Sequence, residues 1–197
     1  KTQKDLYLPK TAPSVIDVPH MTFITVNGRG DPNTGAEYAA AVELLYGLSY
    51  AIKMSSKSIL DYVVAPLEGL WSVDDDFRGG GAAIHDKGKF VWTMMIRQPD
   101  FVTAEILEAA KAALKKKRPD LDMSRAKPDA FAEGLCVQVM HVGPYDDDPA
   151  TVAALDGFAA RSGYVLDFSD LRRHHEIYLS DPRKVPNGKL KTVLRHP

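Results

Sequence analysis

The order in which strand and helix patterns follow one another is the feature that most limits the fold of this chain. Residues 21–30 alternate as a strand, 36–54 carry apolar residues at helical spacing, and 59–67 and 89–97 are again strand-like. The same order of strand, helix, strand and strand returns in 135–197. The chain therefore reads as two βαββ units.

The helices are marked by their ends as well as by their periodicity. Thr103 is a suitable cap for a helix running to Lys117, and Pro119 prevents its continuation. In the second unit, Pro149 follows Asp148 at a helix start and Gly163 marks the stop. Strands are expected on both sides of this last helix, in 135–145, 174–180 and 189–195.

The length of the chain favours a single domain. With 197 residues and 45% hydrophobic content, it can bury one substantial core. Residues 1–20 contain three prolines and are expected to form an extended N-terminal arm. We expect one domain over 21–197, made of two pseudo-symmetric halves at about 21–120 and 130–197.

Neither unit can bury a sheet face alone, so we expect their sheets to join. The predicted fold is α+β, with a curved antiparallel sheet, helices on one side and a ligand cleft on the other.

Charge and cysteine content exclude several functions. Lysine and arginine number 25 against 26 acidic residues, so no field draws the chain to nucleic acid or a membrane surface. The single cysteine, Cys136, excludes an internal disulfide framework and a multi-thiolate zinc site. No apolar run approaches the roughly 18 residues of a membrane span, and no signal peptide is apparent. We expect a cytoplasmic protein without a cofactor; the oligomeric state stays open.

Glu176, on the predicted strand 174–180, is the most unusual residue of the chain. If Ile177 and Leu179 face the helices, then His174, Glu176 and Tyr178 face the open side. A carboxylate among aromatic rings loses hydration and gains from a cation or a hydrogen-bond donor. Glu176 is therefore a binding group or a base; the alternative is an ion pair with a neighbouring arginine on an exposed strand.

Other side chains qualify for the same site. They are aromatic or acidic and lie at strand ends or in strand-like segments: Tyr62, Glu68, Trp71, Trp92 and Tyr145. Trp71 and Trp92 fit a core position equally well, and Tyr145 fits a turn better. The pattern of 90–97 does not show which face of this strand lines the cleft and which faces the helices.

A metal site is not expected. His174 and His175 are adjacent, so they point to opposite faces of a strand and cannot hold one ion together. The aspartate runs 74–76 and 146–148 lack the alternating oxygen spacing of a calcium loop. A solvated turn and a helix cap explain them better.

Three stretches together resemble the GyrI-like small-molecule-binding proteins, whose domain also forms the effector-binding half of multidrug-sensing transcription regulators. They are "APLEGLW" (65–71), "HVGPYDDDPATVAALDGFAARSGY" (141–164) and "HHEIYLSDPRKV" (174–185). The resemblance implies the duplicated βαββ architecture, of the SHS2 type, with a cleft on the pseudo-twofold axis. It also implies that Glu176 is the acidic residue at the pocket base, surrounded by aromatic side chains.

The "LEGLW" stretch is similar to that of a stand-alone subgroup, some of whose members hydrolyse cyclopropane-bearing DNA-alkylating compounds. In that chemistry, as the resemblance implies it, aromatic walls hold a planar substrate and an acidic residue steers water onto the strained ring. Glu176 and Glu68 are then the possible bases. Typical members carry a second aromatic residue after the tryptophan, whereas this chain has Ser72.

Three functions follow as hypotheses. The first is the binding of aromatic or cationic small molecules, for sequestration or detoxification of xenobiotics. The second is hydrolysis of electrophilic cyclopropanes at the same site. The third is regulation through protein contacts, as in gyrase inhibition or with a separate transcription factor; 1–20 is too short for a helix-turn-helix, so direct DNA binding is not expected.

Overall fold

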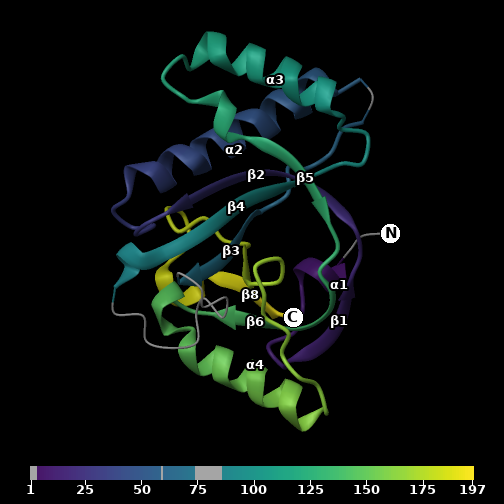
Figure 1. The fold of residues 1–197 in the computed structure, drawn as a ribbon, viewed down its shortest axis with the longest axis vertical. Coiled ribbons are helices and arrows are strands. Elements are labelled where there is room, and N and C mark those ends of the chain that lie inside the picture. The colour runs from purple at the N-terminus through teal and green to yellow at the C-terminus, as the bar shows by residue number, and fades with distance from the viewer. Residues whose placement is uncertain (1–3, 59, 74–85) are drawn as a thin grey trace.

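The computed structural model describes residues 4–58, 60–73 and 86–197, and over these ranges it is an α+β fold (Figure 1). Four α-helices are present, at α1 (Lys4–Tyr7), α2 (Ala36–Ser55), α3 (Ala104–Lys117) and α4 (Pro149–Arg161). Eight strands are present, at β1 (Ser14–Val18), β2 (Met21–Arg29), β3 (Leu67–Val73), β4 (Phe90–Gln98), β5 (Lys127–Phe131), β6 (Gly134–Val142), β7 (His174–Tyr178) and β8 (Lys191–His196).

All eight strands form one antiparallel sheet in the order β1-β6-β8-β7-β3-β4-β2-β5. The unit β2-α2-β3-β4 and the unit β6-α4-β7-β8 occupy equivalent places in this order, because each contributes three adjacent strands. They join where β3 pairs with β7. The predicted α+β class, with duplicated βαββ units in an antiparallel sheet, is confirmed.

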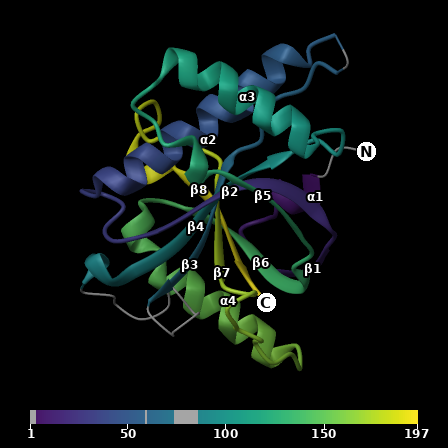
Figure 2. The ribbon, with the colours of Figure 1, turned by 45° about the horizontal axis from the view of Figure 1, so that its top comes forward.

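The sheet is strongly curved, and α2, α3 and α4 lie on its outer face (Figures 1 and 2). Helix α2 packs on β2 and β4, with α3 against α2, while α4 packs on β6 and β8. On the inner face the two ends of the sheet come together, since Val18 of β1 and Phe131 of β5 belong to one apolar cluster with Leu6 of α1. Both faces of the central strands are therefore buried.

The helix ends predicted from single residues are confirmed. The Thr103 hydroxyl accepts a hydrogen bond from the backbone N–H of Ile106 and so caps α3. Pro149 occupies the first turn of α4, and Gly163 follows its end with a φ of 81°, a conformation that favours glycine.

One predicted strand was wrong, and two strands were missed. The strand predicted over 59–67 begins only at Leu67, and the part of the preceding segment that the structure describes is irregular. Val64 and Ala65 instead pack against the core beneath α2, whereas Leu60 and Val63 are exposed. The sequence also gave no sign of β1 and β5, which are the two edges of the sheet.

The N-terminal segment differs from a simple extended arm. It contains α1, and β1 continues the sheet by pairing with β6. Gln138 on β6 donates a 2.7 Å hydrogen bond to the carbonyl of Asp5, so α1 is held to the inner face.

The expected facing of β7 was also wrong. Tyr178 packs with the cluster beneath α2, on the helix-covered face, while Ile177 packs with Met140 and Val193 on the inner face. Alternation along the strand was read correctly, but both faces are buried, so the pattern could not tell which face the helices cover. The side chains at 174, 176 and 178 thus lie on the same face as the helices.

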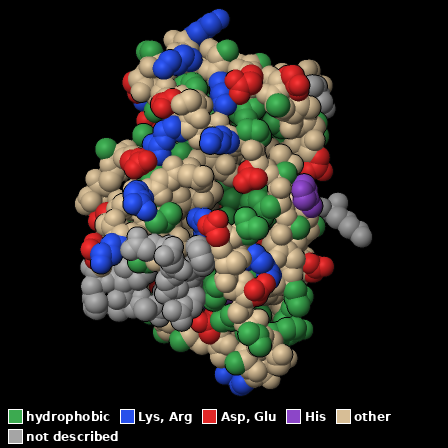
Figure 3. Space-filling view, viewed as in Figure 1, with side chains coloured by type: hydrophobic (Ala, Val, Ile, Leu, Met, Phe, Trp, Pro, Cys, Tyr) green, Lys and Arg blue, Asp and Glu red, His purple; other side chains and the backbone are tan. Residues whose placement is uncertain are grey.

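The surface has no dominant charge on the face that Figure 3 presents, where acidic and basic side chains are interspersed. This agrees with 25 basic and 26 acidic residues in the chain. Within the described ranges, no helix combines the length and apolar character needed to cross a bilayer.

Candidate functional site

The candidate site lies at the joint between the two units, on the outer face of the sheet. Across the β3–β7 pair, Gly69 is opposite Glu176 and Trp71 is opposite His174. Side chains at alternate positions share a face, so Trp71, His174, Glu176 and Tyr178 are neighbours. Four of the residues singled out from the sequence are therefore brought together.

A line of hydrogen bonds crosses this joint. The indole Nε1–H of Trp71 donates to the hydroxyl of Tyr178 at 3.0 Å. Burial, followed by the adjacent Glu176 charge and a hydrogen bond to it, raises the pKa of Tyr178 well above its usual value. The hydroxyl therefore stays protonated next to the Glu176 side chain.

His174 contacts Glu176 directly. Its Nε2 lies 3.1 Å from Oε1 of Glu176, and its Nδ1 lies 2.7 Å from Nε2 of His196 on β8. His196 in turn places its Nδ1 2.6 Å from Oδ1 of Asp156 on α4. The His174 side chain is fully buried, whereas that of Glu176 is 16% exposed. Solvent therefore reaches Glu176, which lies beside Trp71 and Tyr178, but not His174.

Aromatic rings surround the acidic group. Tyr145 meets Tyr178 edge-on with ring centroids 5.5 Å apart, and Phe90 meets Trp71 at 5.3 Å. Tyr38 of α2 lies 6.1 Å from Trp71 and 5.4 Å from Trp92. Trp92 is fully buried, so it supports the other rings from beneath. We call Tyr38, Phe90, Trp71, Tyr145 and Tyr178 the ring cluster.

Asp148 adds a second carboxyl group. Although it precedes α4, its side chain makes no capping hydrogen bond, and its carboxyl lies within 4.8 Å of the ligand atoms of His174 and Glu176. Burial and the charge of Glu176 raise the pKa of Asp148 to about 7. Two carboxyl groups facing one histidine favour a positive charge between them, whether a proton, a metal ion or a cationic group of a ligand. No metal is assigned, because His174 and Glu176 already bond to each other.

Gly69 leaves room beside Glu176. A Cβ at this position would lie 2.7 Å from Nε1 of Trp71 and 3.1 Å from Sδ of Met94. Glycine is therefore required for the indole to lie across the strand and reach Tyr178. The indole therefore fills the place next to Glu176 that a side chain at 69 would take.

Two of the residues proposed from the sequence are placed elsewhere. Tyr62 packs against Phe101, with ring centroids 6.1 Å apart, and no contact in the described part of the chain joins it to Glu176. Glu68 lies on the inner face, where it is fully buried and accepts a 3.0 Å hydrogen bond from Tyr7. Neighbouring strand positions point to opposite faces, so Glu68 and the ring cluster are separated by the sheet. The prediction that Glu68 acts beside Glu176 is therefore wrong.

Glu68 belongs instead to a buried ionic network on the inner face. His175 Nε2 lies 3.0 Å from Oε2 of Glu68, and His175 Nδ1 lies 3.0 Å from Oε1 of Glu133. Arg195 donates to Oε2 of Glu133 at 2.8 Å and to the carbonyl of Leu6 at 2.8 Å. His174 and His175 do point to opposite faces, as expected. One serves the candidate site, and the other serves this network.

The network shifts the protonation of its members. Burial opposes charge on both His175 and Glu133, but their mutual attraction prevails. The Arg195 guanidinium adds to the stabilisation of the Glu133 carboxylate, whereas it opposes the positive charge of His175. The pKa of His175 rises to about 9, and that of Glu133 falls to about 2. With two carboxylates, an imidazolium and a guanidinium, the network is neutral overall.

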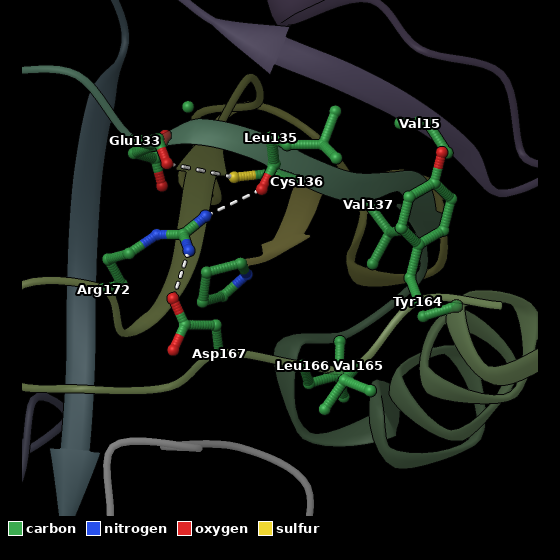
Figure 4. Close-up of a pocket in the computed structure, with 13 residues that line it drawn as sticks. Val15, Glu133, Leu135, Cys136, Val137, Tyr164, Val165, Leu166, Asp167 and Arg172 are labelled. Carbon is green, nitrogen blue, oxygen red and sulfur yellow. Dashed lines mark hydrogen bonds and ion pairs between the residues drawn. The ribbon is translucent and has the colours of Figure 1, made fainter.

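A cavity of about 340 Å³ opens between β6 and the chain that follows α4 (Figure 4). Arg172 at its edge donates to Oδ2 of Asp167 and to the carbonyl of Leu135. Cys136 also lines this cavity, but burial and the charge of Glu133 raise the pKa of its thiol to about 12. The thiol is therefore protonated at neutral pH. A second cavity of about 620 Å³ lies beside His141 and Thr151. Neither is lined by Glu176.

Several residues of the site were not found from the sequence. Tyr38, Phe90, Asp148, Asp156 and His196 come from four segments far apart along the chain. Only Asp148 gave a signal, as one of three consecutive aspartates ahead of a helix, and it pointed to capping. The aspartate run 74–76 lies outside the described residues.

Comparison with known proteins identifies relatives over almost the whole chain. Residues 11–197 match the family model described as GyrI-like small molecule binding domain. An uncharacterized conserved protein from Listeria innocua is 47% identical, with a TM-score of 0.91 over 99% of this chain and 96% of that one. A hydrolase from Listeria innocua is 46% identical, with a TM-score of 0.88 over 99% and 95%.

A more distant similarity concerns the fold alone. The C-terminal domain of EcmrR is 14% identical, with a TM-score of 0.55 over 94% of this chain and 95% of that one. No curated protein sequence matches.

Proposed function

The chain belongs to the GyrI-like small-molecule binding domain family, and on that premise we propose that it binds an aromatic, cationic small molecule between the ring cluster and Glu176. The observation that carries the proposal is a partly exposed acidic side chain, Glu176, that contacts His174 and lies among aromatic rings. Aromatic faces attract cations, and a partly desolvated carboxylate strengthens that attraction. Asp148 adds acidity next to the same point.

The rings and the acid divide the recognition between them. Planar ligands stack on or meet rings edge-on, as Tyr145 and Tyr178 already do with each other. The carboxylate selects for positive charge, because a neutral ligand leaves Glu176 without an additional partner. Sequestration of a planar, cationic xenobiotic is the cellular role that this recognition supports.

Hydrolysis of an electrophilic cyclopropane is the second candidate function. It is supported by the 46% identity to a protein from Listeria innocua described as a hydrolase, and by the histidine beside Glu176. In this reaction Glu176 would take a proton from water while the water oxygen bonds to a ring carbon. The breaking carbon–carbon bond would release its electron pair into the conjugated electron acceptor of the substrate, which is then protonated.

Glu176→Gln tests the role of the carboxylate, because glutamine keeps the size of the side chain and removes its charge. The probes are 9-aminoacridine, a planar cation at pH 7, and acridine, a neutral counterpart with the same rings. We expect the affinity for the cation to fall at least about tenfold, corresponding to roughly 1.4 kcal/mol, and that for acridine to change little. Fluorescence titration measures both affinities.

The matched control for this variant is Glu108→Gln, the same change on the exposed face of α3. It should bind both acridines as the unmodified protein does. Equal binding of 9-aminoacridine by the Glu176 variant would remove Glu176 from the proposed contact. For the hydrolase candidate, mass spectrometry follows addition of one water to a cyclopropane-bearing alkylator, and Glu176→Gln should abolish that product.

Gly69→Ala tests the geometry of the ring cluster without changing charge. The added methyl group would overlap the Trp71 indole, which must move and lose its hydrogen bond to Tyr178. We expect roughly tenfold weaker binding of both acridines, since an aromatic contact contributes on the order of 1 kcal/mol. Gly188→Ala is the control, because nothing lies within 4 Å of the added carbon. If both variants bind alike, Trp71 does not shape the site.

A further inference from the structure

We infer that Asp156, His196 and His174 form a buried proton relay that joins Glu176 to solvent on the side of α4. The relay is a set of contacts of the protein itself, present with or without a ligand. Only its purpose, to set the charge of the ligand-binding carboxylate, rests on the proposed function.

The geometry of the relay is continuous. Asp156 Oδ1 to His196 Nδ1 is 2.6 Å, His196 Nε2 to His174 Nδ1 is 2.7 Å, and His174 Nε2 to Glu176 Oε1 is 3.1 Å. Each distance lies within the range of a hydrogen bond. Both imidazoles use both of their ring nitrogens. The groups come from α4, β8 and β7, so the relay crosses from the helix into the sheet.

The two ends of the relay differ from its middle in their access to water. The side chains of His174 and His196 are 0% and 1% exposed, whereas those of Glu176 and Asp156 are 16% and 39% exposed. Phe168 covers His196 with ring centroids 4.9 Å apart. A proton can therefore leave the middle of the relay only through one of its two carboxyl ends.

The contacts fix the protons that the relay carries. The Asp156 carboxylate accepts from Nδ1–H of His196. Burial lowers the pKa of His196, so its ring is neutral and its Nε2 accepts from Nδ1–H of His174. Nε2 of His174 and Oε1 of Glu176 then face each other and can bond only if one proton lies between them. His174 and Glu176 therefore share one proton.

Other ionisable groups face this shared proton from the elements packed around it. Tyr38 of α2, Tyr145 and Asp148 ahead of α4, and Tyr178 of β7 all act electrostatically with Glu176. Lys87 and Asp146 lie farther out and act on Asp148. The three tyrosines are neutral at pH 7 because burial raises the pKa of each. Asp148, whose pKa is raised to about 7, is therefore the group among these whose charge changes near neutral pH.

Protons and charges balance at every step when a proton moves along the relay. A proton on Glu176 passes to Nε2 of His174, the Nδ1 proton of His174 passes to Nε2 of His196, and the Nδ1 proton of His196 passes to Asp156. Glu176 becomes a carboxylate, Asp156 becomes a carboxylic acid, and both histidines stay neutral with their protons on the opposite nitrogens. No electrons are gained or lost.

Histidine NMR tests the relay without any ligand. Long-range ¹H–¹⁵N spectra of ¹⁵N-histidine-labelled protein report which ring nitrogens of His174 and His196 carry protons. At pH 7 we expect His196 protonated only at Nδ1 and His174 protonated at Nδ1. Asp156→Asn removes the negative charge at the outer end, so the pH midpoint at which His174 and Glu176 lose their shared proton should fall by about half a unit or more.

The matched control is Asp17→Asn, the same change at an exposed position on β1. It should leave both histidine titrations where they are in the unmodified protein. An unchanged His174 titration in folded Asp156→Asn protein would overturn the relay. A relay that passes this test while the acridines fail to bind would leave the relay standing and the proposed function refuted.

A second readout separates proton control from simple support of the site. The affinity for 9-aminoacridine should rise with pH as Glu176 loses the shared proton, and Asp156→Asn should move that rise to lower pH. Asp17→Asn should not move it. A variant that lowers affinity equally at every pH would show that Asp156 only supports the fold of the site.

Discussion

Replacing Arg195 by methionine should lower the free energy of unfolding by about 3 to 5 kcal/mol, the range found when one partner of a buried ion pair is removed. Arg195 is 1% exposed. Without its guanidinium, Oε2 of Glu133 and the carbonyl of Leu6 each lose a hydrogen bond in a place that water does not reach. Urea denaturation followed by circular dichroism measures the change.

Two further variants make the Arg195 result interpretable. Arg183→Met removes an arginine whose side chain is 86% exposed and pairs with Asp181, so the denaturation midpoint should barely move. The double variant Glu133→Gln with Arg195→Met removes the unpaired charge and should recover part of the lost stability. Equal stability of Arg195→Met and Arg183→Met would show that the inner-face network contributes nothing.

Stability should also fall as pH rises from 6.5 to 9, because of His175. Its folded pKa of about 9 lies above the ordinary value of 6.5. The folded state therefore holds this proton more tightly, and the stabilisation is complete below pH 6.5 and lost as pH approaches 9. The shift corresponds to a loss of roughly 2 to 3 kcal/mol over this range. Urea denaturation at three pH values measures it.

His175→Gln is the control for the alkaline decline. It should be less stable than the unmodified protein at pH 6.5, and its stability should vary little up to pH 9. The measurement stops at pH 9 because the Cys136 thiol, whose pKa is raised to about 12 in the folded state, would add its own term at higher pH. A decline of equal size in both proteins would assign the pH dependence to other groups.

The parts of the fold that could be predicted are those encoded locally. Thr103, Pro149 and Gly163 marked helix ends because capping and left-handed backbone depend on single residues. Strand β5, "KPDAF", escaped notice because it is an edge strand with a proline and little buried surface, and so shows no alternation. The segment before β3 was read as a strand because irregular chain can be as apolar as a strand, both where it packs on the core, as at Val64, and where it is exposed, as at Val63.

The candidate site also divides into residues that a local pattern could group and residues that only the folded chain brings together. Glu176, His174 and Tyr178 were grouped correctly because alternation on one strand is a local property. Glu68 was misplaced because its face depends on the register between β3 and β7, which is set across the sheet. His196 and Asp156 lie 40 residues apart in the chain and meet only when α4 packs on β8, so no local pattern could reveal them.

The position of the site at the β3–β7 joint gives the two copies of the βαββ motif different tasks. The first copy contributes shape, through Gly69 and the indole of Trp71, and the part of it that the structure describes places no carboxyl group beside them. The second contributes ionisable chemistry, through Glu176 and His174. After such a duplication, substitutions in one copy can retune which molecules fit while the other keeps its acid–base machinery. Diversity of ligands can thus arise without rebuilding the chemistry.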